Sequence, residues 1–160
     1  MATIEKQIQD ALVTLLSAAY LPVDDRDVTI ARELPDERLS QRALPLVVVD
    51  RPSLLSDAPW GYGSRLKSYT VPILCVDGSH VSVAKLRDSK ERVQQLRDNV
   101  LQVLHASRHF GLATIGVFES LVTYDVGDDM QDVGNNLHAL SILLTIPCTI
   151  AVSAPVAPDP

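Results

Sequence analysis

The chain has 160 residues and a net charge of −6, and its composition, 46% hydrophobic and 21% charged, is that of a globular protein rather than a disordered one. This length predicts one domain with a substantial core, which must be aliphatic because only 4% of the residues are aromatic. A nucleic-acid-binding surface needs clustered Lys and Arg to neutralise phosphates, so the negative net charge argues against nucleic-acid binding as the main function. This net charge does not exclude a local basic patch.

The chain begins with a predicted amphipathic helix. Thr3 suits the N-cap position, apolar residues recur at helical spacing over residues 4–19, and Pro22 closes the pattern. Charged residues at positions 5, 6 and 10 interrupt the apolar stretch, so no signal peptide is expected and the protein should be cytosolic where it is made. A short strand is predicted around residues 28–31, followed by a charged, exposed connection over residues 32–42.

The next segments predict two strands separated by a long loop. Residues 44–49, LPLVVV, are nearly continuous in apolar residues, which suits a central strand covered on both faces. Residues 50–65 contain two prolines, two glycines and the only tryptophan, and long loops of this kind are usually functional or mobile. Residues 66–76 alternate as a strand, in which Pro72 cannot donate to a ladder and so predicts an edge or a bulge.

The most regular pattern is a long helix over residues 82–105. Apolar residues from Leu86 to Leu104 recur at three- and four-residue steps, and no glycine or proline interrupts them. Asp88 precedes Arg92 by four residues, the favourable order for a weak ion pair. We expect this helix to lie across the sheet as the organising element of the core.

Two strands, residues 114–124 and 137–152, are predicted to follow and to pair as an antiparallel hairpin. The last strand could extend about 50 Å at ~3.3 Å per residue, more than one small sheet needs, so its end is expected to project and to pair with something else. The fold class is therefore α+β: a mixed, mainly antiparallel sheet, one long amphipathic helix across it, a shorter N-terminal helix and a long C-terminal β-hairpin. Residues 1–152 form the single domain, and residues 153–160 a disordered, proline-rich tail.

Cys75 and Cys148 both lie on the expected inward face of strands. Two buried free thiols are the simpler interpretation, and a disulfide between them is the alternative. The longest apolar run, residues 139–152, contains polar residues and is shorter than the ~20 residues of a membrane span, so no membrane association is expected.

No residue pattern predicts catalysis or a cofactor. His105 and His109 have the spacing of two metal ligands on a helix, but no third ligand lies nearby, and histidines near a helix C-terminus are favoured by the dipole. The Gly61-Tyr62-Gly63 sequence lacks the third glycine of a dinucleotide motif and does not open a helix. We therefore expect no enzyme activity, no metal and no cofactor.

Candidate interface residues fall in three groups. Trp60, Tyr62 and Arg65 are of the types that anchor interfaces, although the tryptophan could equally fold back onto its own domain. The acidic loop between the last two strands lacks the ligand pattern of an EF-hand, so it is either a solvated tip or a surface that repels a polyanion; its aspartates are Asp125, Asp128, Asp129 and Asp132. Pro147 and Thr149, in the overlong last strand, form the third group.

The order of elements resembles that of the tail terminator (tail completion) proteins of long-tailed bacteriophages. The resemblance spans about residues 3–152 and is one of topology and hydrophobic rhythm, which related neck proteins and some tail-tube proteins share. It rests on these segments: MATIEKQIQDALVTLL, LPLVVVD, SYTVPILCVDG, AKLRDSKERVQQLRDNVLQVL, GVFESLVTYDVG and LHALSILLTIPCTI.

The resemblance implies a structural virion protein found in the tail or neck, and in the host cytoplasm during assembly. Such proteins form a ring, usually a hexamer, that caps the tail tube, stops its polymerisation and joins it to the head-completion protein, while DNA passes through the lumen without specific binding. An acidic balance suits such a conduit, because a positive lumen would hold DNA. The alternatives are a head–tail adaptor or stopper, a tail-tube subunit, or, from another class, a small ligand-binding domain or enzyme.

Overall fold

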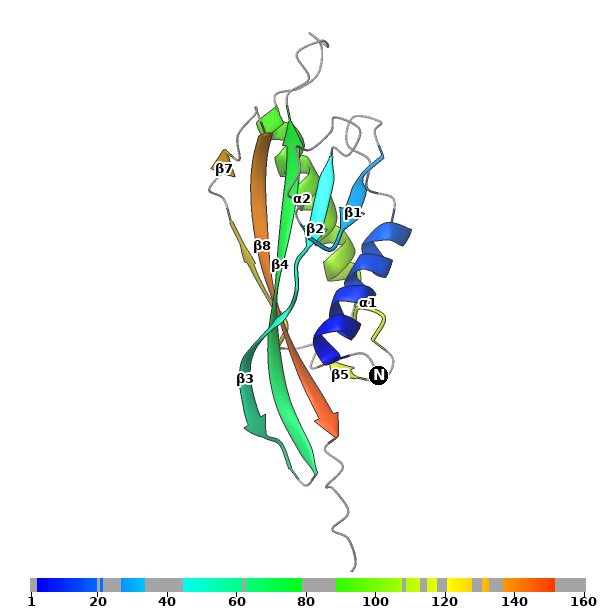
Figure 1. Cartoon of the computed structure of the whole chain (residues 1–160), viewed down its shortest axis with the longest axis vertical. Coiled ribbons are helices and arrows are strands. Elements are labelled where there is room, and N and C mark those ends of the chain that lie inside the picture. The colour runs from blue at the N-terminus through cyan, green and yellow to red at the C-terminus, as the bar shows by residue number, and fades with distance from the viewer. Residues whose placement is uncertain are drawn as a thin grey trace, which may run out of the picture.

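A computed structural model of the chain describes residues 3–19, 21, 27–33, 45–61, 63–78, 89–107, 109–112, 115–117, 121–127, 131–132 and 137–151. In these residues the helices pack on one sheet (Figure 1). The elements are α1 (Ile4–Ala18), β1 (Thr29–Ala31), β2 (Leu46–Val49), β3 (Ser53–Pro59), β4 (Ser64–Gly78), α2 (Ser89–Ala106), β5 (Gly116–Val117), β6 (Thr123–Val126), β7 (Gln131–Asp132) and β8 (Leu137–Ala151). The predicted tail, residues 153–160, lies outside the described residues.

The sheet is built around β4 and β8, which pair antiparallel over all 15 residues of each strand. The other edge of β4 pairs first with β3 and then with β2, while the other edge of β8 pairs in turn with β7, β6 and β5. Only the β1–β2 pair is parallel among the described strands. The predicted α+β class with a mixed, mainly antiparallel sheet is confirmed, as is the antiparallel pairing of the last strand with the segment before it.

Pro72 marks the point at which β4 changes partner. The backbone N–H of Asp50, between β2 and β3, donates to the carbonyl of Pro72 at 2.9 Å. The N and the C=O of a strand residue point to the same side of the strand, so the position of the missing N–H of Pro72 faces the segment between β2 and β3. The β4–β8 ladder, on the other side of β4, therefore loses no hydrogen bond. The interruption that the sequence predicts at Pro72 is therefore confirmed.

Pro147 has the same role on β8. The carbonyl of Ser141 faces the outer edge of β8, because it accepts a hydrogen bond from the N–H of Gly127 at 2.9 Å. Pro147, six residues further along the strand, faces the same edge and offers no N–H there. The neighbouring strand is broken at this point: β6 ends its pairing opposite Thr145, and β5 pairs opposite Cys148 and Thr149. The single strand predicted over residues 114–124 is therefore wrong, and Pro147 supplies the physical reason.

Both helices form where the sequence predicts them. Thr3 Oγ1 accepts a hydrogen bond from the N–H of Lys6 at 3.2 Å, which confirms the N-cap of α1. The predicted long helix is confirmed over residues 89–105, and residues 82–88 lie outside the described part of the chain. The helices bury one face against the sheet, with these residues: Ile8, Leu12, Leu16, Val93, Leu96, Val100 and Leu104.

Arg92 of the long helix is buried and pairs with a residue of the sheet. Its side chain is 1% exposed, and its Nε donates to Oδ2 of Asp77, which is 0% exposed, at 3.1 Å. Asp77 belongs to β4, since this strand continues to Gly78 instead of turning after Val76. The predicted partner, Asp88, lies outside the described residues.

Cys75 and Cys148 are both free and buried, as the simpler interpretation predicted. The register places Cys148 opposite Lys67, eight residues along β4 from Cys75, a separation of about 26 Å at ~3.3 Å per residue. Burial raises the pKa of the Cys75 thiol to about 12 and that of Cys148 to about 11. No disulfide joins the two residues in this fold.

Neither thiol should react with a thiolate-seeking reagent in the folded protein at pH 8, and both should react after denaturation. Because folding raises both pKa values, the protonated thiols contribute stability that is complete below about pH 9 and declines as the pH rises toward 11 and 12. Timed thiol labelling and urea unfolding at pH 8 and pH 10 measure these effects. Cys75→Ala should reduce the loss of stability between the two pH values. Labelling of the native protein at the rate of a free cysteine would contradict the burial.

Candidate interaction surfaces

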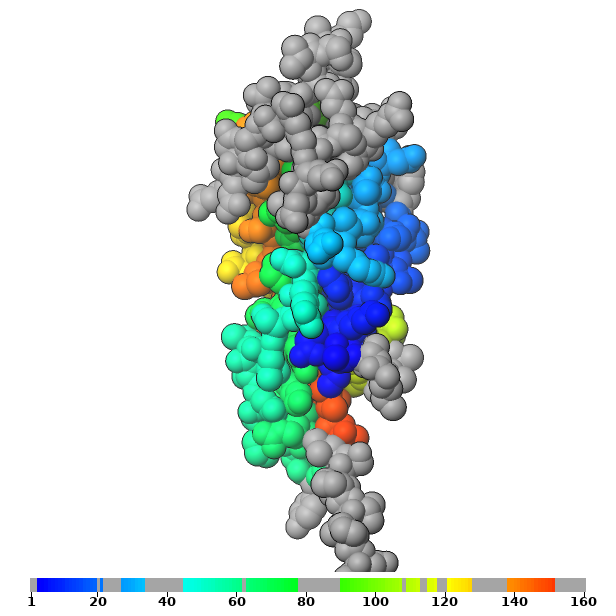
Figure 2. All heavy atoms as spheres, viewed as in Figure 1, coloured from blue at the N-terminus to red at the C-terminus, as the bar shows by residue number. Residues whose placement is uncertain are grey.

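The lower ends of β3, β4 and β8 extend beyond both helices as a narrow three-stranded ribbon (Figures 1 and 2). We call this ribbon the arm: β3 with residues 60–70 and 145–151. The prediction of a loop over residues 50–65 is wrong, since residues 53–59 form β3 and pair with β4 across a bulge between Leu54 and Ser56. The end of the last strand projects as expected, and β4 of the same chain pairs with one of its edges throughout. Its pairing with another molecule stays a prediction.

The base of the arm is buried in the core at Tyr69, Ile146 and Cys148. Toward the tip, polar side-chain contacts join its strands in addition to the backbone ladders. Arg65 Nε lies 2.7 Å from Asp57 Oδ1, and Lys67 Nζ lies 3.9 Å from Asp57 Oδ2. The hydroxyls of Ser53 and Thr70 are hydrogen-bonded at 3.0 Å. Arg65, a predicted interface residue, therefore bridges β4 and β3 and remains 40% exposed at its side chain.

The turn at the tip of the arm joins β3 to β4. The N–H of Trp60 donates to the carbonyl of Ser64 at 3.0 Å, and Gly61 and Gly63 both have positive φ, which glycine adopts without steric cost. Trp60 is 44% exposed, so close to half of its surface faces solvent. Tyr62, predicted beside it, lies outside the described residues.

Every residue of β3 is exposed, including two adjacent leucines that the interface prediction did not include. Leu54 is 48% exposed and Leu55, at the bulge, is 63% exposed. A pair of large apolar side chains in an otherwise polar segment was the signal available in the sequence. These leucines give the arm apolar side chains that are largely open to solvent, and Trp60 is partly exposed near them.

The free backbone edge of β3 is poorly suited to pairing with another strand. Backbone N–H and C=O groups of successive residues in β3 point alternately toward β4 and away from it. The N–H of Trp60 points toward Ser64 of β4, so the backbone groups of Pro59 and Asp57 point toward the other edge of β3. Proline offers no N–H there, and a bulge and a charged residue are further devices that discourage edge pairing. The arm is therefore expected to bind through its side chains rather than by strand addition.

The acidic residues do not form one free tip. Asp125 is exposed within β6, opposite Leu143 of β8, and Asp132 lies in β7, opposite His138. Asp128 and Asp129 lie outside the described residues. The start of the loop is anchored, because Gly127 donates to Ser141 and accepts from Nη1 of Arg97 on α2 at 3.1 Å.

Pro147 and Thr149 make contacts within the chain. Pro147 is buried, and Thr149 is half-buried with its Oγ1 donating to the carbonyl of Gly116 at 3.3 Å. A Cβ at Gly116 would lie 2.6 Å from Thr149 Oγ1, so a larger residue here would have to displace this hydroxyl.

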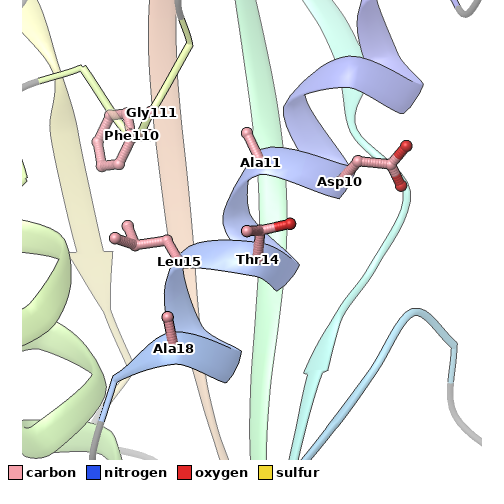
Figure 3. A pocket seen from close by; sticks show the side chains of 7 residues that line it. All are labelled: Asp10, Ala11, Thr14, Leu15, Ala18, Phe110 and Gly111. Carbon is pink, nitrogen blue, oxygen red and sulfur yellow. The ribbon is translucent and has the colours of Figure 1, made fainter.

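A cavity of about 440 Å³, which no sequence pattern had indicated, opens beside α1. In Figure 3, Phe110 and Leu15 face one another from the turn after α2 and from α1. Phe110 has φ 54°, a left-handed conformation unusual for a non-glycine residue, and its N–H is held by Ser107 Oγ at 3.0 Å. The lining is mainly apolar: Asp10, Ala11, Thr14, Leu15, Ala18, Phe110 and Gly111.

The described residues contain no group of three or more His, Cys, Asp or Glu that could hold a metal ion. The ring of His105 packs edge-on against Tyr124, with centroids 4.5 Å apart, and Tyr124 Oη donates to the carbonyl of Leu104 at 3.3 Å. No helix among the described residues is long and apolar enough to cross a membrane. The described residues offer two candidate contact surfaces: the arm and the cavity beside α1.

The fold is similar to that of a chain in a solved virion structure. The chain is similar to a chain in a solved structure described as "Virion of native gene transfer agent (GTA) particle", with a TM-score of 0.53 and 9% sequence identity; the match covers 92% of this chain and 99% of that one. At this identity the similarity is one of fold. No family model matches the sequence, and no curated protein matches it.

Proposed function

We propose that this chain is a structural virion protein of a long-tailed phage or phage-like particle, and specifically a tail terminator. The observation that supports this most is the fold match to a virion component over 92% of this chain and 99% of the other, so the two share a whole domain and not a common motif. The resemblance of the element order to tail terminators carries the finer assignment. In this function a ring of copies caps the tail tube, stops its polymerisation and joins it to the head-completion protein.

The arm is the surface best suited to a contact outside the chain. It projects beyond the helices and ends in Trp60 and Arg65, residue types that dominate interface energetics. Leu54 and Leu55 add apolar area that a partner would remove from water. Pro147 and Thr149 support the arm from within rather than by forming its outer surface.

DNA passes through the ring without specific binding in this proposal. The chain carries a net charge of −6, and the sheet face turned away from the helices presents hydroxyl and apolar side chains over β4 and β8, among them Ser68, Thr70, Ser141, Leu143 and Thr145. Uncharged side chains such as these make few phosphate contacts and release few counterions, so they do not hold passing DNA.

The test is to add the purified protein to polymerising tail-tube protein and to measure tube lengths by electron microscopy. A terminator shortens the tubes and is found as a ring at one end. Growth of long tubes from this protein alone would identify a tail-tube subunit instead. Binding to the head-completion complex with no effect on tubes would identify an adaptor or stopper.

Removing residues 128–130 from the acidic loop should leave folding intact and impair assembly or DNA passage. The chain is anchored just before this segment by the two hydrogen bonds of Gly127, so the free energy of unfolding should change by no more than about 0.5 kcal/mol. Urea unfolding and the tube assay measure the two effects. The matched variant Asp128→Asn/Asp129→Asn keeps the loop length and tests the charge alone. Loss of folding in the shortened variant would make the loop structural and overturn its assignment.

A further inference from the structure

The arm and the body of this chain carry opposite net charges. The arm contains two cations and one anion, a net charge of +1, so the remaining residues of a chain with net charge −6 carry −7. The cations are Arg65 and Lys67, and the anion is Asp57. Two arms brought together would repel one another, and so would two bodies, whereas an arm is attracted to the body of another copy.

The apolar features of the arm and body are also complementary. The arm carries exposed leucines at positions 54 and 55, and the cavity beside α1 is lined mainly by Ala11, Leu15, Ala18 and Phe110. Its volume of about 440 Å³ lies in the range of roughly 300–1,000 Å³ typical of binding pockets. Asp10, at the same cavity, is 39% exposed and lies 3.1 Å from Arg32, so its attraction for an arriving cation is partly cancelled and apolar contact must contribute most.

We propose that the arm of one copy docks on the cavity beside α1 of the next copy. The arm points away from α1 in its own chain (Figure 1), so the contact joins two molecules. Because the arm and the cavity are different surfaces, the contact is head-to-tail, and repetition of it closes a ring when the rotation between copies permits. This inference rests on the proposed function, to which it adds the two surfaces that join neighbouring copies.

Cross-linking between two single-cysteine additions tests the docking. Leu55→Cys places a thiol on the arm and Ala18→Cys places one at the cavity, while the native Cys75 and Cys148 are buried and should not react. One variant carries a size tag, and the two are mixed under conditions in which light scattering shows assembly. A short bifunctional maleimide should then give the mixed dimer at least tenfold more strongly than either self-dimer, and a double variant should give a ladder of covalent oligomers.

The control is Gln102→Cys, on the exposed side of α2, which should not cross-link to Leu55→Cys. A dominant Leu55→Cys self-dimer would show an arm-to-arm contact and overturn the docking, as would equal cross-linking to position 102 or a monomer at every concentration. Circular dichroism checks that each exposed substitution preserves the fold. Rings that cap tubes but give no mixed cross-link would refute the docking and leave the proposed function supported. The mixed cross-link with no effect on tubes would support the docking and refute the proposed function.

Discussion

Replacing Asp77 with alanine should lower the free energy of unfolding by about 3–5 kcal/mol, the usual cost of breaking a buried ion pair on one side. The carboxylate of Asp77 accepts from Arg92 Nε at 3.1 Å, and both side chains are almost fully excluded from water. The substitution leaves the guanidinium of Arg92 in the interior without this counter-charge. Urea unfolding measures the change, and the apolar pair Asp77→Leu/Arg92→Met should recover part of the loss because it buries no charge.

The matched control is the ion pair of the arm. Arg65 and Asp57 are closer, at 2.7 Å, but their side chains are 40% and 31% exposed. Water and salt screen such a pair, so Asp57→Ala should cost less than about 1 kcal/mol. Burial and not distance therefore decides which pair contributes more to stability. An equal cost for the two alanine substitutions would refute this.

The centre of the fold could be predicted from the sequence because its patterns are long and regular. The alternation along β4 and β8 and the helical period of α2 each continue for many residues, and such patterns exist only where one face is buried. The inward positions of Cys75 and Cys148 follow from the same alternation.

The arm could not be predicted in this way. Every residue of β3 is exposed, so no alternation of polar and apolar residues marks it, and the prolines at positions 52 and 59 suggest a loop. Neither proline breaks a needed ladder bond: Pro52 precedes the strand, and Pro59 faces the open edge. Strand formation here depends on the length of β4, which provides a template beyond the core.

The missing N–H of a proline interrupts strand pairing at both Pro72 and Pro147, but only the interruption at Pro72 was predicted from the sequence. A missing N–H predicted the interruption opposite Pro72, and the same reasoning at Pro147 would have predicted that residues 114–124 divide into β5 and β6. The cavity beside α1 is different, since it joins α1 to a turn almost 100 residues later. Only tertiary packing creates it, and no local pattern in the sequence could indicate it.

Leu96 and Leu55 offer the same side chain in two opposite environments. Leu96 is fully buried between α2 and the sheet, so Leu96→Ala should reduce the free energy of unfolding by about 2–5 kcal/mol, the cost of a lost apolar contact plus a cavity. Leu55 is 63% exposed at the bulge of β3, so Leu55→Ala should change the free energy of unfolding by no more than about 0.5 kcal/mol. Denaturant unfolding of both variants measures this difference, and an unchanged stability for Leu96→Ala would place that side chain outside the core.

Leu55→Ala, the variant with the smaller effect on stability, should have the larger effect on assembly. Leu96→Ala leaves the arm and the cavity beside α1 unaltered, so the molecules that remain folded should still form rings and stop tube growth. Leu55→Ala removes the most exposed apolar side chain of the arm from a stable molecule, so it should weaken ring formation at a given concentration about tenfold or more. Light scattering over a concentration series, under conditions in which both variants are folded, separates the effects. Normal rings from Leu55→Ala would show that the arm of this chain serves a contact other than the one between copies.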